Sequence, residues 1–162
     1  MADIEKAIIK AFGNKLRLRV SGLLIENDQI LLINHHNLGA ENDFWSPPGG
    51  GLNFGESIDD CLKREFLEET GLNIDVGSFV CVNEFLSPPL HAIELFFFVS
   101  KRTGDLQTGL DPELADNRQI IQETTFLPLG QLQKMPPAAY HNIFHALHHL
   151  GDLKSIETFH ST

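Results

Sequence analysis

Three glutamates lie close together in the sequence, at Glu65, Glu68 and Glu69. In a helix each residue turns by about 100°, so Glu65 and Glu69 would continue the apolar stripe begun by Ile58 and Leu62. Carboxylates at this spacing repel one another, and the C-terminal end of a helix disfavours negative charge. A divalent cation would offset both costs, and ligands that are all oxygen favour Mg²⁺ or Mn²⁺ over zinc. The pattern therefore predicts a metal site rather than a solvated helix face.

A glycine-rich segment stands just before this helix. Gly49, Gly50, Gly51 and Gly55 allow the backbone to approach a ligand closely and to adopt positive φ angles. A glycine cluster by itself usually marks an ordinary turn. Beside a helix that carries carboxylates, we expect Gly49, Gly50 and Gly51 to hold a phosphate chain against the metal.

Two pairs of charged residues complete the candidate site. Glu56 and Arg64 are expected to form an ion pair that ties the glycine loop to the helix. Arg17 and Arg19 share one face of an early strand, where they would meet phosphate or ribose. The alternative for this second pair is that both arginines occupy the solvent side of the strand.

Other histidines and aromatic residues are weaker candidates. His35 and His36 stand at the end of a predicted strand, from which they could reach a substrate. Phe44 and Trp45 could stack on a base, although aromatic residues beside a Pro-Gly loop are more often packing residues. The remaining histidines considered lack a cysteine or carboxylate at supporting spacing, so surface and packing roles are expected for His141, His145, His148 and His149.

Periodicity and turn signals predict the elements that position these residues. Helices are expected over 3–12, 57–70 and 137–150, with a loop over 45–55 and a flexible tail over 151–162. Strands are expected over 15–20, 29–33, 74–76, 79–85, 93–100 and 122–127, the last after an acidic loop at 111–116. The apolar run 95–99 predicts a strand that is covered on both faces. The order predicts one α/β domain over residues 1–162, with helices on both sides of a mixed sheet.

Composition excludes several classes of partner. Lys plus Arg number 12 against 22 Asp plus Glu, which gives a formal charge of −10 and no basic run for nucleic acid or an anionic membrane. The N-terminus does not resemble a signal peptide, and no apolar run is long enough to span a bilayer. Cys61 and Cys81 are expected to be reduced, packed thiols. These features favour a cytoplasmic location.

Segment 50–72 resembles the signature of the Nudix hydrolase family at every specified position. The lead-in 45–49, Trp-Ser-Pro-Pro-Gly, is also similar to that family, and the predicted strand order fits it. The matching positions of the signature are Gly50, Glu56, Arg64, Glu65, Phe66, Glu68, Glu69, Gly71 and Leu72.

The resemblance implies an α/β/α sandwich that hydrolyses a nucleoside diphosphate linked to another group. By this likeness Glu65, Glu68 and Glu69 would ligate Mg²⁺, with Arg64 orienting them and Glu56 anchoring the loop or adding to metal binding. Glu65 or Glu68 is expected to act as the base. Some family members use a glutamate from a later loop, for which Glu113 and Glu123 are further candidates. A homodimer is expected from family habit.

The resemblance leaves the substrate and two other functions open. The substrate would be a nucleotide sugar such as ADP-ribose or a (deoxy)nucleoside triphosphate, because additional motifs of other Nudix subfamilies are absent. The main alternative function is a catalytically silent Nudix-fold module that binds a ligand. It is disfavoured because such modules typically lose the carboxylates. The isoprenoid diphosphate isomerases are disfavoured because no early Cys/His/Glu metal set is evident.

Overall fold

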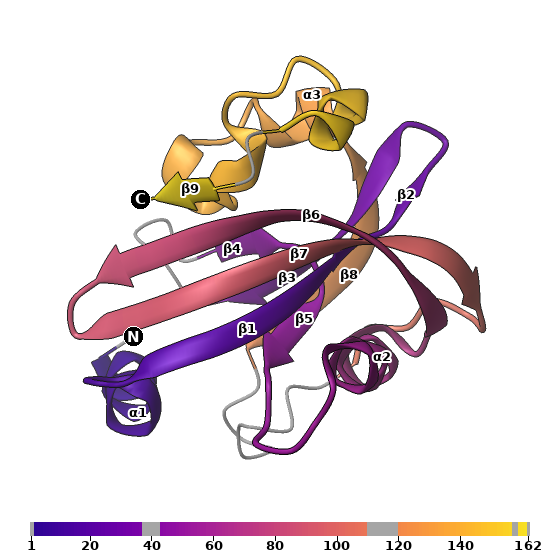
Figure 1. The fold of residues 1–162 in the computed structure, drawn as a ribbon. Coiled ribbons are helices and arrows are strands. Elements are labelled where there is room, and N and C mark those ends of the chain that lie inside the picture. The colour runs from indigo at the N-terminus through magenta and orange to yellow at the C-terminus, as the bar shows by residue number, and fades with distance from the viewer. Residues whose placement is uncertain (1, 37–42, 110–119, 157–158, 162) are drawn as a thin grey trace.

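Two β-sheets form the centre of the protein (Figure 1). The computed structural model describes residues 2–36, 43–109, 120–156 and 159–161. One sheet has the strand order β5-β1-β7-β6-β9, and in the other β3 pairs with β2 and β4 along one edge and with β8 along the other. The first sheet is mixed, because β1 runs parallel to β7 and β6 parallel to β9, while β5 is antiparallel to β1 and β6 is antiparallel to β7. The strands are β1 (Leu16–Leu23), β2 (Ile25–Glu26), β3 (Gln29–His36), β4 (Asp43–Ser46), β5 (Gly49–Gly51), β6 (Asn73–Ser87), β7 (Leu90–Thr103), β8 (Ile121–Pro128) and β9 (Phe159–Ser161).

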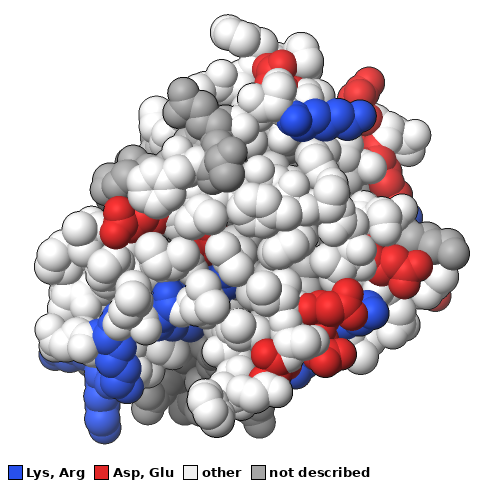
Figure 2. All heavy atoms as spheres, viewed as in Figure 1, with Lys and Arg blue, Asp and Glu red and all other residues white. Residues whose placement is uncertain are grey.

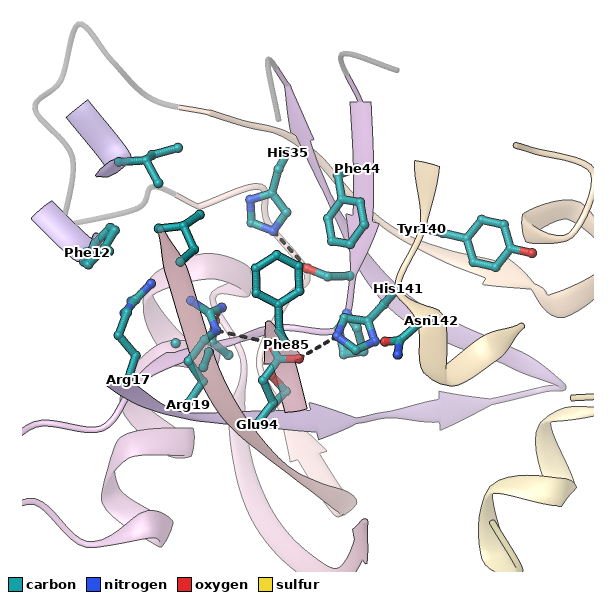
Figure 3. A pocket seen from close by; sticks show the side chains of 18 of the residues that line it. Phe12, Arg17, Arg19, His35, Phe44, Phe85, Glu94, Tyr140, His141 and Asn142 are labelled. Atoms are coloured by element: carbon teal, nitrogen blue, oxygen red, sulfur yellow. Dashed lines mark hydrogen bonds and ion pairs between the residues drawn. The ribbon is translucent and has the colours of Figure 1, made fainter. Parts of the chain in front are cut away.

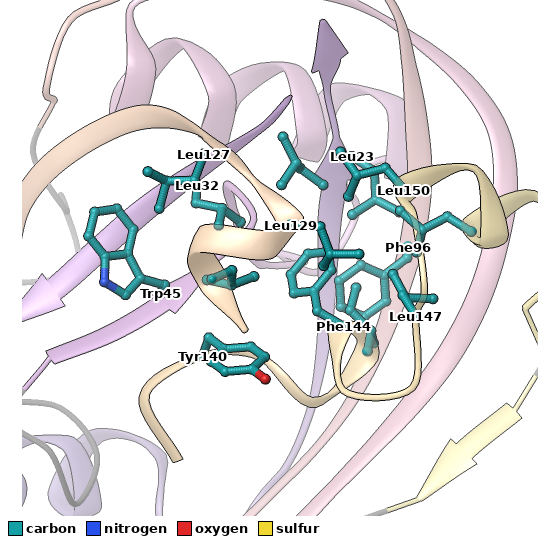
Figure 4. Packing of buried hydrophobic residues seen from close by; sticks show 14 of the residues in the cluster. Leu23, Leu32, Trp45, Phe96, Leu127, Leu129, Tyr140, Phe144, Leu147 and Leu150 are labelled. Carbon is teal, nitrogen blue, oxygen red and sulfur yellow. The ribbon is translucent and has the colours of Figure 1, made fainter. Parts of the chain in front are cut away.

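Helical segments cover the sheets from both sides, which confirms the α/β/α arrangement and the mixed α+β class (Figure 1). The helix α2 packs against β1, β5 and β6, and its buried face forms one apolar cluster with Leu31 and Ile74. The C-terminal segment covers the other side and forms a second cluster around Phe96 and Phe144 (Figure 4). The helical segments are α1 (Ala2–Phe12), α2 (Ile58–Thr70), α3 (Leu129–Leu132), η2 (Pro137–Ala139), η3 (Asn142–Phe144) and η4 (Leu150–Lys154).

Strand β7 separates the two apolar clusters, as the run 95–99 predicts. Phe96 and Phe98 pack into the cluster under the C-terminal segment, whereas Phe97 and Val99 pack against the cluster under α2. Both cysteines are buried and free. Within the described residues, none of the helices is long and apolar enough to cross a membrane.

Helix α2 begins and ends where its capping residues predict. Ser57 is the N-cap, and its Oγ accepts a hydrogen bond from the Asp60 N–H at 3.1 Å. Gly71 ends the helix in the left-handed conformation, with φ of 71°. On the face shown in Figure 2, acidic and basic side chains lie together over α2, where Asp59 pairs with Lys63 at 2.6 Å. Asp59 and Lys63 thus form an ion pair on the solvent face of the helix.

The loop expected over 45–55 is in part β structure, which corrects the prediction. Residues Asp43–Ser46 form β4, and Gly49–Gly51 form β5, which pairs with β1 in the register Arg19 with Gly51 and Ser21 with Gly49. Glycine does not exclude a strand, but it weakens one because it contributes no side chain to packing. Here the strand is stabilised by pairing and by its position beside α2.

The α-helix expected over 137–150 is also wrong. The segment forms the short 3₁₀ turns η2 and η3, and Tyr140 between them is extended, with φ of −150° and ψ of 161°. The extended residue pairs with Trp45, whose carbonyl accepts the His141 N–H at 2.9 Å. Tertiary contacts therefore override the helical spacing, while 3₁₀ turns still place the apolar side chains in the core. In the described part of the tail, residues Leu150–Lys154 form η4, and β9 pairs with β6.

Candidate functional site

The glutamates of α2 differ in burial, as the helical spacing predicts. Glu65 and Glu69 are each 5% exposed and face the sheet, whereas the side chain of Glu68 is 31% exposed at the edge of the helix. Glu65 and Glu69 both line a cavity of about 510 Å³. The sequence thus places two carboxylates, one helical turn apart, in the wall of a cavity.

Arg64 connects the glutamates to the glycine loop. Its guanidinium forms a bidentate pair with Glu56 at 2.8 and 3.0 Å, as expected, and also contacts Glu65 at 2.7 Å and Glu68 at 3.2 Å. A further N–H donates to the Gly51 carbonyl at 3.3 Å. The hydrogen bonds from Arg64 hold the pKa of Glu56 down at about 2, although burial of the carboxyl opposes this shift. Glu56 is therefore ionised at neutral pH, and one side chain restrains three carboxylates.

The glycines of β5 let the backbone approach these carboxylates. The Gly49 N–H donates to Glu69 Oε2 at 2.8 Å, which contributes a charge-assisted hydrogen bond. A Cβ atom at Gly50 would overlap the carboxylate of Glu65, and a Cβ at Gly49 would overlap the carbonyl of Val20. Both positions therefore require glycine, because neighbouring atoms lie too close to the backbone to leave room for a Cβ. Both glycines line the cavity.

The donor chemistry of this region fits a hard divalent cation. Glu65 and Glu69 supply buried carboxylate oxygens at the cavity wall, and Glu68 and Glu56 adjoin them through Arg64. Among the residues that the structure describes, no three His, Cys, Asp or Glu side chains converge on a single point. Arg64 stands between Glu56, Glu65 and Glu68 as their cationic partner.

The cavity extends from these carboxylates along β1 (Figure 3). Arg17, Arg19 and Ser21 alternate on one face of β1 and line it, so the two arginines lie on the cavity side rather than the solvent side. The Arg19 guanidinium donates to the Gly49 carbonyl at 3.2 Å. The guanidinium carbon of Arg17 lies 3.6 Å from the centre of the Phe12 ring, a cation–π contact with α1.

The remaining candidates divide between cavity, core and surface. His35 and Phe44 line the cavity, whereas Trp45 is packed in the core. Burial, together with the charge of Arg19, lowers the pKa of His35 to about 4, so this imidazole is neutral at pH 7. Glu123 on β8 is exposed and is not among the cavity-lining residues, and Glu113 lies outside the described residues.

Sequence reasoning missed a buried polar group that also lines the cavity. Glu94 on β7 and His141 are 9% and 7% exposed, and Glu94 Oε2 lies 2.9 Å from His141 Nε2. His141 has a packing role, as expected, but against a carboxylate. The signal available in the sequence was Glu94 itself, a single charge inside the apolar strand segment AIELFFF, where burial is costly without partners. The cavity contribution of α1, through Ile8 and Phe12, was also missed.

Comparison with known proteins identifies the family. Residues 15–149 match the NUDIX domain. An ADP-ribose pyrophosphatase of Methanocaldococcus jannaschii is 32% identical over 136 residues, covering 82% of this chain and 75% of the relative. An 8-oxo-dGTP diphosphatase of Buchnera aphidicola is 32% identical over 84 residues, covering 51% of this chain and 62% of the relative.

Solved structures show the same fold at low identity. A MutT NUDIX hydrolase from Burkholderia pseudomallei superposes with a TM-score of 0.64 at 16% identity, covering 81% of this chain and 94% of that chain. An ADP-ribose pyrophosphatase from Streptococcus suis superposes with a TM-score of 0.54 at 18% identity, covering 90% and 96%. With the family domain matched over most of the chain and the signature residues Gly50, Glu65 and Glu69 at the cavity wall, this chain belongs to the NUDIX family and is a Nudix hydrolase.

Proposed function

We propose that this protein is a divalent-metal-dependent pyrophosphohydrolase that cleaves a nucleoside diphosphate linked to another group. The observation that carries the proposal is the burial of Glu65 and Glu69 at the wall of a cavity of about 510 Å³. Two carboxylates buried one turn apart carry a cost of repulsion and desolvation that a bound cation offsets.

Glu65, Glu68, Glu69 and Glu56 are the residues proposed to hold Mg²⁺, or Mn²⁺ in its place. The bound ion would offset the charge of the pyrophosphate oxygens and lower the pKa of a coordinated water. Glu65 or Glu68 would accept the proton of the attacking water. Arg64 would position both carboxylates, since it contacts each of them and is fixed to Glu56 by a bidentate pair.

The substrate end of the cavity suits a nucleotide. Gly49, Gly50 and Gly51 are proposed to lie along the phosphate chain, with Arg17 and Arg19 near phosphate or ribose. The names of two relatives, an ADP-ribose pyrophosphatase and an 8-oxo-dGTP diphosphatase, support a nucleotide sugar such as ADP-ribose or a (deoxy)nucleoside triphosphate. We also expect a cytoplasmic location, which cell fractionation tests, and a homodimer, which sedimentation equilibrium tests.

A panel of nucleotide sugars, triphosphates and dinucleoside polyphosphates with Mg²⁺, analysed by chromatography, tests the activity and identifies the bond cleaved. Glu65→Gln and Glu68→Gln should each lower kcat/KM on the best substrate by about 100-fold or more, because each removes a carboxylate proposed to bind the metal and to accept the proton. Asp59→Asn on the exposed face of the same helix is the matched control and should keep full activity. Full activity in both glutamine variants would reject the site. Tight binding of a nucleotide sugar without product in Mg²⁺ or Mn²⁺ would instead favour a silent binding module.

A further inference from the structure

Polar side chains on three neighbouring strands lie side by side, and two of them, Arg19 and Glu94, line the cavity (Figure 3). The strand register places Arg19 on β1 beside Glu94 on β7, and Glu94 beside Asn83 on β6. The neighbouring row, Arg17 with Ala92 and Phe85, is mainly apolar. A carboxylate therefore lies in the middle of the sheet surface, under a cavity whose other walls include several aromatic side chains.

The two oxygens of Glu94 are not equally satisfied. Oε2 accepts a hydrogen bond from the Asn83 amide at 2.8 Å and lies 2.9 Å from His141 Nε2. Since His141 Nδ1 accepts the Ile143 N–H at 3.3 Å, its Nε2 is assigned as the protonated nitrogen that donates to Glu94. Within the described part of the chain, the contact of Oε1 is the Arg19 guanidinium at 3.5 Å, which is long for a hydrogen bond. Oε1 therefore has room for one strong donor.

Glu94 is an acceptor at neutral pH. Burial raises the pKa of this carboxyl, but His141, Arg19 and Asn83 outweigh burial and bring the pKa to about 2. An ionised carboxylate accepts hydrogen bonds and does not donate them. The ligand group that meets Oε1 must carry an N–H or O–H, and a phosphate or a carbonyl edge would be repelled.

The surrounding walls favour a flat ring. Phe12 from α1, Phe44 from β4 and Phe85 from β6 all line the cavity, as does Tyr140 of the C-terminal segment (Figure 3). Aromatic side chains bind planar bases by stacking, with little dependence on which base is present. Discrimination between bases then depends on the few polar groups in the wall, and Glu94 is the charged acceptor on this side of the cavity.

We propose that Glu94 is a specificity-determining residue whose Oε1 accepts a hydrogen bond from the exocyclic amino group of a purine. The protein would thus select adenine or guanine nucleotides over hypoxanthine nucleotides, which lack that amino group and whose donor on that edge, the ring N1–H, stands at a different position. This inference rests on the proposed function only in taking a nucleotide as the ligand. A site that rejects a ligand lacking a partner for a buried polar group discriminates strongly, because that group is left unpaired.

Glu94 also has a structural role, which the experiment must separate. Asn83 donates to Glu94 and accepts the Asn142 amide at 2.8 Å, so the group ties the C-terminal segment to the sheet. Asn83 is 1% exposed and is not among the cavity-lining residues. Asn83→Ala therefore disturbs the same hydrogen bonds without facing the ligand, and it serves as the matched control.

Calorimetry with AMP, GMP and IMP, without metal, tests the inference on the intact chain. Wild type should bind AMP or GMP about 10- to 100-fold more tightly than IMP. In Glu94→Gln the amide nitrogen can face the ligand, so the preference should fall to about onefold or reverse. Asn83→Ala should lower Tm but keep the wild-type preference. Equal binding of all three nucleotides by wild type, no measurable binding of any of them, or an equal loss of preference in both variants would overturn the proposal.

Hydrolysis with Mg²⁺ separates this inference from the proposed function. ADP-ribose against its hypoxanthine analogue, and dGTP against dITP, identify which amino group Glu94 contacts. Hydrolysis of both members of each pair at equal kcat/KM would overturn the inference and leave the proposed function standing. Discrimination in binding without hydrolysis of any of these substrates would support this inference and overturn the proposed function.

Discussion

Arg64→Lys tests whether the arginine positions the carboxylates or only balances their charge. The substitution keeps the positive charge but replaces a planar fork by a single ammonium. Arg64 donates twice to Glu56 and once each to Glu65 and Glu68, and a lysine at the same position cannot reach all three carboxylates with this geometry. Because the guanidinium side chain is 30% exposed, each lost bond is discounted for screening to about 1 kcal/mol. Loss of two bonds then lowers the free energy of unfolding by about 2 kcal/mol, or Tm by roughly 4–8 °C.

The effect on activity should be larger than the effect on stability. A carboxylate displaced by about 1 Å costs roughly 100-fold in rate, so kcat/KM should fall by that factor. Arg102→Lys is the matched control, since Arg102 forms a bidentate pair with Glu26 at 2.7 and 2.8 Å and is 31% exposed. It should lower Tm by a few degrees and leave kcat/KM unchanged. If Arg64→Lys keeps kcat/KM within about threefold while Tm falls, Arg64 only fastens the loop and the positioning role is wrong.

Three further predictions address the loop, the pH dependence and the metal. Gly50→Ala should lower kcat/KM by about 100-fold, because the added Cβ overlaps the Glu65 carboxylate. The control Gly130→Ala places its Cβ in open space and should leave kcat/KM unchanged. Equal kcat/KM in the two variants would contradict the close approach of Gly50 to Glu65. The pKa of Glu56 is lowered from 4.5 to about 2, so its contribution to stability is present above pH 4.5 and is lost as the pH falls toward 2. Thermal denaturation at a series of pH values should show Tm falling over that range, and Glu56→Gln should make the fall less steep. The same dependence of Tm on pH in Glu56→Gln would contradict the prediction. Mg²⁺ at a hundredfold excess over its dissociation constant should raise Tm of the wild type by roughly 5–10 °C, and Glu65→Gln or Glu69→Gln should remove most of that rise. An equal rise of Tm in the glutamine variants would show that Mg²⁺ binds at another site.

The part of the site that lies on α2 could be predicted because its signals are local. Ser57 and Gly71 mark the ends of the helix by their own backbone requirements, and the spacing of Glu65 and Glu69 fixes which face they share. Burial of both glutamates follows from that spacing, since the apolar stripe must face the sheet. These inferences need no knowledge of which strands pair.

The missed features all depend on contacts between distant segments. Residues 49–51 are a strand because β1 supplies the pairing partner, and composition alone favours a loop there. Residues 137–150 have apolar positions at helical spacing, but the backbone pairing of Tyr140 with Trp45 interrupts the helix. Glu94 becomes a cavity residue only through a register that sets it beside Arg19 and under His141. Local propensity does not contain that information.

Arg19 on β1 connects the buried carboxylate of Glu94 with the glycine segment that holds Glu69. Arg19 lies 3.5 Å from Glu94 on one side and donates to the Gly49 carbonyl on the other, while the Gly49 N–H donates to Glu69. A shift of Arg19 would therefore change the environment of the buried Glu94 and the orientation of the residue that holds Glu69. Since both carboxylates are at least nine-tenths buried, neither can exchange these partners for water without a large desolvation cost. Strand β1 thus fixes the distance between the carboxylates of α2 and the acceptor on β7, and that distance limits which ligands can contact both.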